Sequence, residues 1–91
     1  MWKIVETGQF KKDLKRYQHQ TDKLLALSSV LQSLRDSGTV PASNKPHRLA
    51  GKWNGYMECH IQSDFLLIWL NAESQEIRVV RLGTHAELFG R

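Results

Sequence analysis

The run FLLIWL at residues 65–70 is the longest uninterrupted apolar segment of the chain, and it constrains the fold most strongly. It is far shorter than the ~20 residues that a membrane-spanning helix needs. Turn-forming residues stand on both sides of it, Ser63 and Asp64 before and Asn71 after. A short apolar run between turn signals is typical of a buried strand. The sequence therefore predicts a central β-strand with apolar residues on both faces.

Two further segments of strand character flank this run. The segment YMECHI (56–61) alternates, with one face made of Tyr56, Glu58 and His60 and the other of Met57, Cys59 and Ile61. The segment EIRVVRL (76–82) predicts another strand, and the links between the three are short enough for an antiparallel meander. If helices cover the Met57 face, Tyr56, Glu58 and His60 are expected on the exterior. A polar and aromatic sheet face is typical of a binding surface.

The first half of the chain predicts one strand followed by two amphipathic helices. WKIVE (2–6) has strand character, and GQFKKDLKRYQHQ (8–20) places Phe10, Leu14 and Tyr17 at helical spacing. A second helix is expected from an N-cap at Thr21 or Asp22 to a stop at Ser37 and Gly38. The segment 39–55 contains both prolines and predicts a long irregular connection.

These elements together predict an α+β fold in the order β-α-α-β-β-β. The two N-terminal helices pack on one face of a small, mostly antiparallel sheet, and a short turn or helix ends the chain. A length of 91 residues fits a single domain spanning 1–91. The N-terminus lacks the apolar core of a signal peptide, and Cys59 is the only cysteine, so we expect a cytoplasmic protein without an intrachain disulfide.

The formal net charge of +4 makes polyanions suitable partners. Basic residues cluster in the KKDLKR segment, which also fits the solvated face of a helix, and across Lys45, Arg48 and Lys52. We predict that Lys45, Arg48 and Lys52 contact RNA, but charge alone does not decide the function.

The residues that could carry chemistry lie in the second half of the chain: His47, His60, Asp64, Arg81 and His85. Strand pairing can bring them together, since each lies beside a loop or a strand end. Imidazoles, a carboxylate and a guanidinium provide the base, acid and cation that RNA transesterification needs. That reaction needs no metal, and no cofactor is expected. His19 lies at the expected end of the first helix, and we assign it no role.

Other chemistry fits the same residues less well. His47, His60, Asp64 and His85 offer nitrogen and oxygen ligands for zinc, but their spacing lacks a tight helical motif. No G-x-S-x-G elbow accompanies the serines. Strict alternation places Arg81 on the helix-covered face, so a bulge or the strand's end must redirect it if it is to act in catalysis.

The segments HRLAGKWNGYMECHIQSDFLLIWL (47–70) and RLGTHAELF (81–89) resemble the YafQ branch of the RelE/ParE toxin superfamily. The resemblance covers nearly all of the second half in order, and the first half fits the start of that fold. It implies a RelE-like domain that is a ribosome-dependent messenger RNA endoribonuclease. It also implies inhibition by a small antitoxin of the RelB/DinJ kind in a hetero-oligomeric complex, with the ribosome and mRNA as further partners and no membrane association.

Carried over by position, the family's functional residues are His47, His60, Asp64, Phe65, Arg81, His85 and Phe89. Phe65 stands where relatives often have tryptophan, and Met57 where a basic residue often stands. Phe65 would supply a stacking surface, while Phe89 would stack on a base or pack the C-terminal turn. His85 is the favoured general acid and His60 or Asp64 the base. Two other functions stay open, a ParE-like poison of DNA gyrase and a basic nucleic-acid-binding module.

Overall fold

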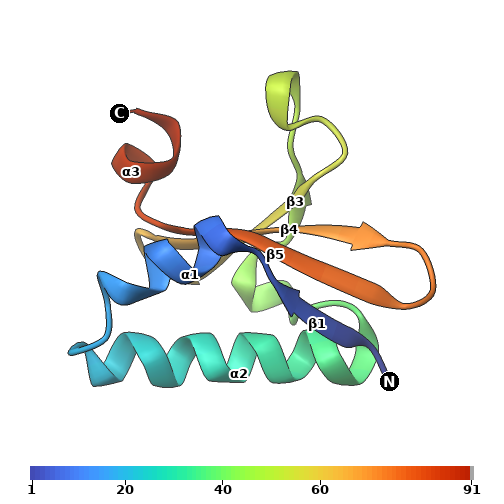
Figure 1. The fold of residues 1–91 in the computed structure, drawn as a ribbon, viewed down its shortest axis with the longest axis horizontal. Helices are drawn as coiled ribbons and strands as arrows, with labels where there is room; N and C mark the ends of the chain where they lie inside the picture. Colours follow the sequence, from blue (N-terminus) through green and yellow to red (C-terminus); the bar gives the residue numbers. More distant parts are fainter. Residues whose placement is uncertain (91) are drawn as a thin grey trace.

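The computed structural model describes residues 1–90, arranged as a five-stranded sheet with helices around it (Figure 1). The strands are β1 (Lys3–Glu6), β2 (His47–Arg48), β3 (Met57–Gln62), β4 (Phe65–Ala72) and β5 (Glu76–Gly83). The α-helices are α1 (Gly8–Lys15), α2 (Thr21–Ser37) and α3 (His85–Phe89), and two 3-10 turns are η1 (Ala42–Asn44) and η2 (Gly51–Trp53). Each helix within residues 1–90 is too short or too polar to cross a membrane.

The strand order in the sheet is β1-β5-β4-β3-β2, with β1 parallel to β5 and the other pairs antiparallel. This confirms the predicted α+β fold and its β3–β4–β5 meander. The connection 39–55 differs from the prediction, because His47 and Arg48 pair with Glu58 and Met57 and add a fifth strand. A strand of two residues is too short for side-chain alternation to reveal it.

Capping residues set where α1 and α2 begin and end. The Thr7 hydroxyl accepts the Phe10 N–H at 3.2 Å and donates to the Val79 carbonyl at 3.0 Å, so the chain leaves the sheet at the point where α1 starts. The N-cap of α2 is Gln20, without a side-chain bond, and not Thr21 or Asp22 as predicted. Gly38 ends α2 in the left-handed conformation as expected, and a Cβ there would lie 2.4 Å from the Trp2 ring.

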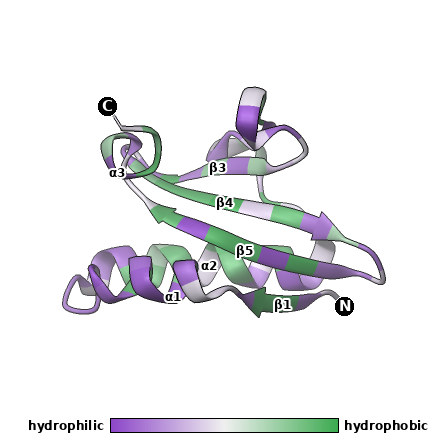
Figure 2. Ribbon diagram, turned by 45° about the horizontal axis from the view of Figure 1, so that its top comes forward, coloured by the Kyte–Doolittle hydropathy of each residue, from purple (hydrophilic) through white to green (hydrophobic). Residues whose placement is uncertain are grey.

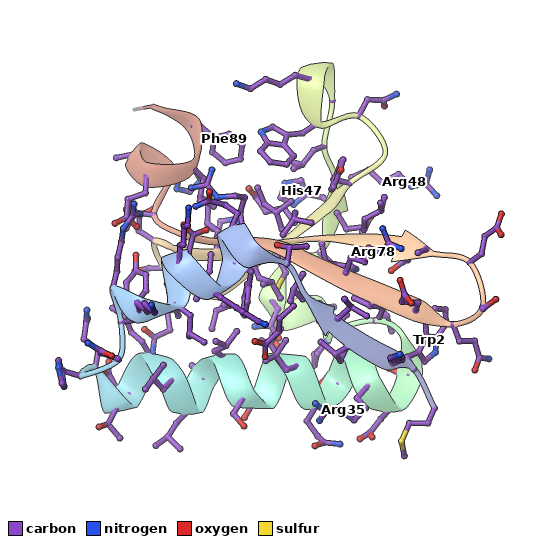
Figure 3. All side chains as sticks on the ribbon, viewed as in Figure 1. Trp2, Arg35, His47, Arg48, Arg78 and Phe89 are labelled. Carbon is purple, nitrogen blue, oxygen red and sulfur yellow. The ribbon has the colours of Figure 1, made fainter. Side chains whose placement is uncertain are left out.

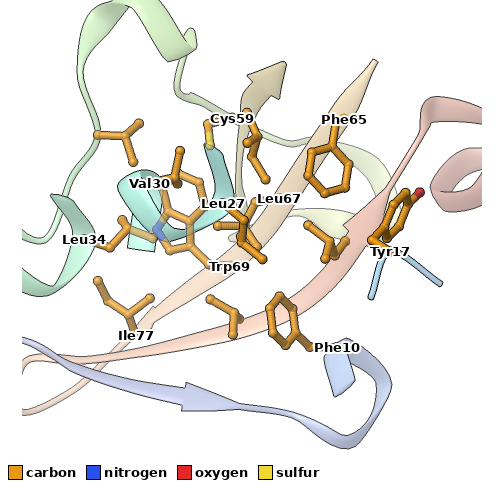
Figure 4. Packing of buried hydrophobic residues seen from close by; sticks show 14 residues of the cluster. Phe10, Tyr17, Leu27, Val30, Leu34, Cys59, Phe65, Leu67, Trp69 and Ile77 are labelled. Carbon is orange, nitrogen blue, oxygen red and sulfur yellow. The ribbon is translucent and has the colours of Figure 1, made fainter. Parts of the chain in front are cut away.

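The main core lies between the sheet and the helices (Figure 4). β4 contributes Phe65, Leu67 and Trp69 to it, and α2 contributes Leu27, Val30 and Leu34. Phe65 is fully buried, with its ring centroid 4.7 Å from that of Tyr17. This corrects the expectation that Phe65 offers a stacking surface, because its ring fills the core.

The opposite face of the sheet carries a second, smaller apolar cluster. Leu66 and Ile68 of β4 are buried there with Leu88 of α3, and partly buried residues surround them: Leu49, Trp53, Tyr56, Val80 and Phe89. Figure 2 shows the apolar residues along β4 and β5. The prediction of apolar residues on both faces of β4 is confirmed. The expected exposed polar face is wrong at Glu58, which is 3% exposed.

Candidate active site

An open cleft lies on this second face of the sheet, with Leu49, Glu58, His85 and Phe89 lining a volume of ≈ 430 Å³. In Figure 1, α3 and the loop that carries η2 rise from this face, away from α2. Strand register aligns residues across the floor, because Glu58 pairs with His47 on one side and with Ile68 on the other. The cleft therefore has a partly apolar wall and ionisable groups at its base.

The three predicted histidines stand side by side on the cleft face of the sheet, and His85 itself lines the cleft. The His60 ring lies between the other two, with centroid distances of 6.3 Å to His47 and 5.9 Å to His85. The Phe89 ring follows at 6.2 Å from the His85 ring. His47 comes from β2, His60 from β3 and His85 from the first turn of α3. The fold thus brings together three imidazoles from separate segments, as the sequence predicted.

Asp64 holds His85 through two contacts to one carboxylate oxygen. Oδ1 lies 2.7 Å from the ring Nδ1 and accepts the backbone N–H of His85 at 2.9 Å. The backbone bond and then the ring bond lower the pKa of Asp64, so the carboxylate stays ionised. An ionised carboxylate only accepts hydrogen bonds, so Nδ1 carries the proton and Nε2 is left for other partners. Asp64 therefore orients His85.

Glu58 is a site residue that the sequence prediction omitted. Its Oε1 lies 3.1 Å from Nε2 of His47, and Oε2 is buried without a hydrogen-bond partner in the described part of the chain. Nδ1 of His47 faces the Lys45 carbonyl at 3.0 Å. Both His47 nitrogens thus face acceptors, so the two bonds together require an imidazolium or a protonated Glu58. Alternation in the β3 segment had already placed Glu58 on the same face as His60, and that signal could have identified it.

The position of α3, and with it His85, depends on a capping box. The Thr84 hydroxyl accepts the Glu87 N–H at 3.1 Å, and the Glu87 carboxylate accepts the Thr84 N–H at 2.9 Å. Glu87 also accepts a hydrogen bond from the Tyr17 hydroxyl and lies 3.6 Å from the Arg16 guanidinium. Burial and the bond to Glu87 raise the pKa of Tyr17, so its hydroxyl remains a donor. The end of α1 is thereby fastened to α3.

Arg81 lies on β5, where the ladder with β4 is irregular. Ile68 pairs with Arg81 and Trp69 with Val79, so Val80 is an extra residue on the β5 side. This β-bulge puts Arg81 in register with Ile68 on the cleft face. It is the kind of bulge that the sequence analysis required if Arg81 is to leave the helix-covered face. Arg81 also forms an ion pair with Asp13 of α1, at 2.8 Å from Nε to Oδ2.

The predicted RNA-binding residues are distributed unevenly. Lys45, Arg48 and Lys52 are exposed, and Lys45 lines a polar hollow of ≈ 440 Å³ that His60 also lines. Arg48 pairs with Met57, so it lies on the other face of the sheet from His47, and Figure 3 shows it pointing away from α3. Phe89 is half-buried against the second cluster and also lines the cleft. Phe89 therefore packs against the second cluster and also forms part of the cleft wall.

The site also contains groups that could hold a metal ion. Glu58, His60 and His85 each offer a ligand atom, and these atoms lie within 4.8 Å of one another. Carboxylate and imidazole donors suit zinc and related transition metals. This set differs from the one weighed from the sequence, since Glu58 takes the place of His47 and Asp64.

The match to a family model over residues 2–90 assigns the chain to a class of bacterial toxins, those of type II toxin-antitoxin systems. A YoeB/ParE toxin from Agrobacterium tumefaciens has the same fold, with a TM-score of 0.80 over 91% of this chain and 98% of that chain, at 19% identity. More specifically, residues 2–90 match the family model described as bacterial toxin of type II toxin-antitoxin system, YafQ. The chain belongs to this family.

Two relatives show how close the similarity is. The mRNA interferase toxin YafQ of Escherichia coli K12 is 37% identical over 90 residues, covering 96% of this chain and 95% of the relative. The crystal structure of the E. coli DinJ-YafQ toxin-antitoxin complex contains a chain that superposes with a TM-score of 0.84 at 34% identity, covering 98% of each chain. The resemblance inferred from residues 47–70 and 81–89 is confirmed.

Proposed function

We propose that this chain is a ribosome-dependent mRNA endoribonuclease that cleaves by acid–base transesterification and so inhibits translation. Family membership supports the toxin class, and the curated relative is named an mRNA interferase. The observation that carries the proposal is the row of His47, His60 and His85, with Asp64 bonded to Nδ1 of His85 at 2.7 Å. Such a row supplies both a proton acceptor and a proton donor in one cleft.

In the proposed reaction, His60 accepts the proton of a ribose 2′-hydroxyl while the 2′-oxygen bonds to phosphorus. His85, as an imidazolium, donates its Nε2 proton to the 5′-oxygen as the bond from phosphorus to that oxygen breaks, and Nδ1–H stays bonded to Asp64. The products are a 2′,3′-cyclic phosphate and a 5′-hydroxyl. Asp64 orients His85 and stabilises its charged form. In this scheme His60, and not Asp64, is the general base. Arg81 offsets the charge that develops on the phosphate oxygens.

Glu58 and His47 complete the proposed acid–base system. Oε1 of Glu58 lies 3.1 Å from Nε2 of His47, and the unpartnered Oε2 of Glu58 is buried at the floor of the cleft. The His47 ring lies 6.3 Å from the His60 ring, so this pair places a carboxylate and an imidazole beside the proposed base. Because side chains supply base, acid and cation, the scheme requires no metal.

The RNA would lie along the cleft with a base against Phe89 and phosphates near Lys45 and Lys52. Aromatic stacking is worth ~1–3 kcal/mol per base. The cognate inhibitor would be a DinJ-like antitoxin, by analogy with the DinJ-YafQ complex. A segment of it covering the basic cleft would block access of mRNA. Co-purification with a DinJ-like partner tests this, and a complex that still cleaves mRNA would contradict masking of the site.

The decisive experiment is primer extension on a translated message with purified protein. His85→Ala should slow single-turnover cleavage by ~10²–10⁴-fold, the usual contribution of general acid–base catalysis, while ribosome binding stays close to parental. His19→Ala is the matched control, since His19 is exposed in the turn after α1. If the parental protein left translated messages intact, the proposed nuclease activity would be wrong and a non-catalytic toxin would be favoured.

A further inference from the structure

Asp13 is a fully buried carboxylate that the acid–base scheme leaves without a role. It lies on α1 and contacts Leu82 of β5, which comes after Val79, the last residue of β5 that pairs with β1. Its Oδ2 accepts the Arg81 Nε–H at 2.8 Å and the Leu82 backbone N–H at 2.9 Å. Its Oδ1 accepts the Gln9 amide at 3.0 Å and lies 3.4 Å from Nη2 of Arg81.

The β-bulge explains why Arg81 needs an anchor. The extra residue Val80 turns Arg81 out of the helix-covered face, and a long flexible side chain there would sample many rotamers. Asp13 instead contacts its guanidinium at both Nε and Nη2. An arginine has five N–H donors, so these two contacts leave three donors for another acceptor. The Arg81 side chain is 21% exposed, so part of it remains accessible.

We propose that Asp13 is the positioning residue for Arg81, holding the guanidinium ready for the phosphate of the RNA. The inference rests on the proposed nuclease function. Asp13 bonds the guanidinium and the Leu82 backbone through the same oxygen, so the guanidinium is fixed to the strand that carries it. A fixed guanidinium loses little further freedom when a phosphate binds, and it needs no reorganisation as charge develops.

The chain contains an internal control for the first measurement. Arg78 donates its Nε–H to Glu76 at 2.7 Å, nearly the same distance, but its side chain is 54% exposed. In nuclear magnetic resonance exchange experiments on the parental protein, we expect the Arg81 Nε–H to exchange with water at least about tenfold more slowly than that of Arg78, since protection follows burial and opening. In Asp13→Asn, the Arg81 exchange should rise toward the Arg78 rate. Equal rates in the parental protein would overturn the anchoring.

The second measurement separates positioning of Arg81 from a structural role at Leu82. Asp13→Asn keeps an oxygen for the Leu82 N–H but loses the charge that holds Arg81. It should slow single-turnover cleavage at saturating ribosomes about tenfold with Arg81 present, and less than about twofold in an Arg81→Ala background. Equal losses in both backgrounds would show a merely structural role. Gln9→Ala, which removes a partner of Asp13 other than Arg81, should cleave at close to the parental rate.

A third variant covers the case in which Asp13→Asn does not fold. Arg81→Lys keeps the charge but cannot contact both carboxylate oxygens through a planar fork, so it should cleave within about threefold of Arg81→Ala. Cleavage by Arg81→Lys at the parental rate would overturn the need for an anchored guanidinium. A parental protein that cuts no mRNA would instead overturn the proposed function, and the exchange comparison would still report whether Asp13 holds Arg81.

Discussion

Oδ1 of Asp64 contacts His85 twice, at the ring Nδ1 (2.7 Å) and at the backbone N–H (2.9 Å). Asp64 stands in the turn between β3 and β4, and His85 begins α3, with one residue between it and the end of β5, so the two meet only when β4 and β5 are paired. The contact fixes both the ring and the start of α3. A side chain that acts as a proton donor in the proposed reaction is thus oriented by a neighbouring carboxylate, which leads to the first prediction.

Asp64→Asn should slow cleavage at least about tenfold, because an amide can turn its NH₂ toward Nδ1 and favour the wrong tautomer. Adding His85→Ala to this variant should cause little loss beyond that of His85→Ala alone, since the two residues act as one unit. The measurement is single-turnover cleavage on programmed ribosomes. Asp36→Asn, an exposed change on α2, is the control. Full additivity of Asp64→Asn and His85→Ala would contradict the orienting role.

Glu58→Met should make the protein more stable and less active. A buried acceptor without a partner costs ~1–3 kcal/mol, and methionine fills a similar volume without that acceptor. Glu58→Met also loses the bond to half-exposed His47. We therefore expect the free energy of unfolding to rise by about 1 kcal/mol net, which raises Tm by about 4–8 °C. Calorimetry and cleavage of the same preparations test this. Glu73→Met in the exposed β4–β5 turn should change neither, and a lower Tm for Glu58→Met would contradict the argument.

The acid stability of the protein should depend on Asp13. Burial alone would raise the pKa of this carboxyl, but hydrogen bonds from Arg81 and from the Leu82 N–H outweigh burial and lower the pKa below its ordinary value of 3.8. A pKa lowered by folding gives stability that is present above the unfolded-state pKa and lost as the pH falls through the folded-state pKa. The Tm difference between parental protein and Asp13→Asn should therefore be largest above about pH 4 and shrink below it. If the Tm difference between the two proteins grew as the pH falls, the predicted direction of the pH dependence would be wrong.

Cleavage should survive a zinc-selective chelator and leave a 2′,3′-cyclic phosphate or 3′-phosphate end. The reason is that His60, His85 and Arg81 provide the base, acid and cation of the proposed reaction. The ribosome needs magnesium, so the chelator must spare that ion, and end-group analysis of the product should accompany the rate. Loss of cutting that added zinc restores would assign Glu58, His60 and His85 to a metal centre instead.

Periodicity was sufficient to predict most of the fold. The apolar run that became β4 faces two cores, and the second predicted helix, α2, ends at Gly38 as expected. The convergence of His47, His60, Asp64 and His85 was also predicted, because antiparallel pairing brings strand ends together. These features depend on local order along the chain, which a sequence displays directly.

Features that depend on three-dimensional context could not be predicted. Burial of Phe65 requires its contact with Tyr17, which follows the end of α1 and lies far from it in sequence. The bulge at Val80 lies in the segment 76–82, which is rich in β-branched residues and has no glycine to mark the bulge. Glu58 is buried on the face where Leu49 and Trp53 of the 39–55 connection and Phe89 of α3 pack against the second cluster, and no single segment shows that pattern.

The parallel pairing of β1 with β5 has a consequence for the time course of folding. Lys3 lies opposite Glu76, so segments from the two halves of the chain must meet before α1 can deliver Asp13 to β5. Contacts this distant in sequence form slowly because the intervening chain must first lose entropy, whereas a tight hairpin such as β3–β4 closes rapidly. We therefore expect a newly made molecule to pass through an inactive interval in which His60 is already in a strand while Arg81 is still unanchored. In pulsed hydrogen exchange, protection of the Leu82 amide should lag behind that of β3, giving an antitoxin time to bind before the first cut.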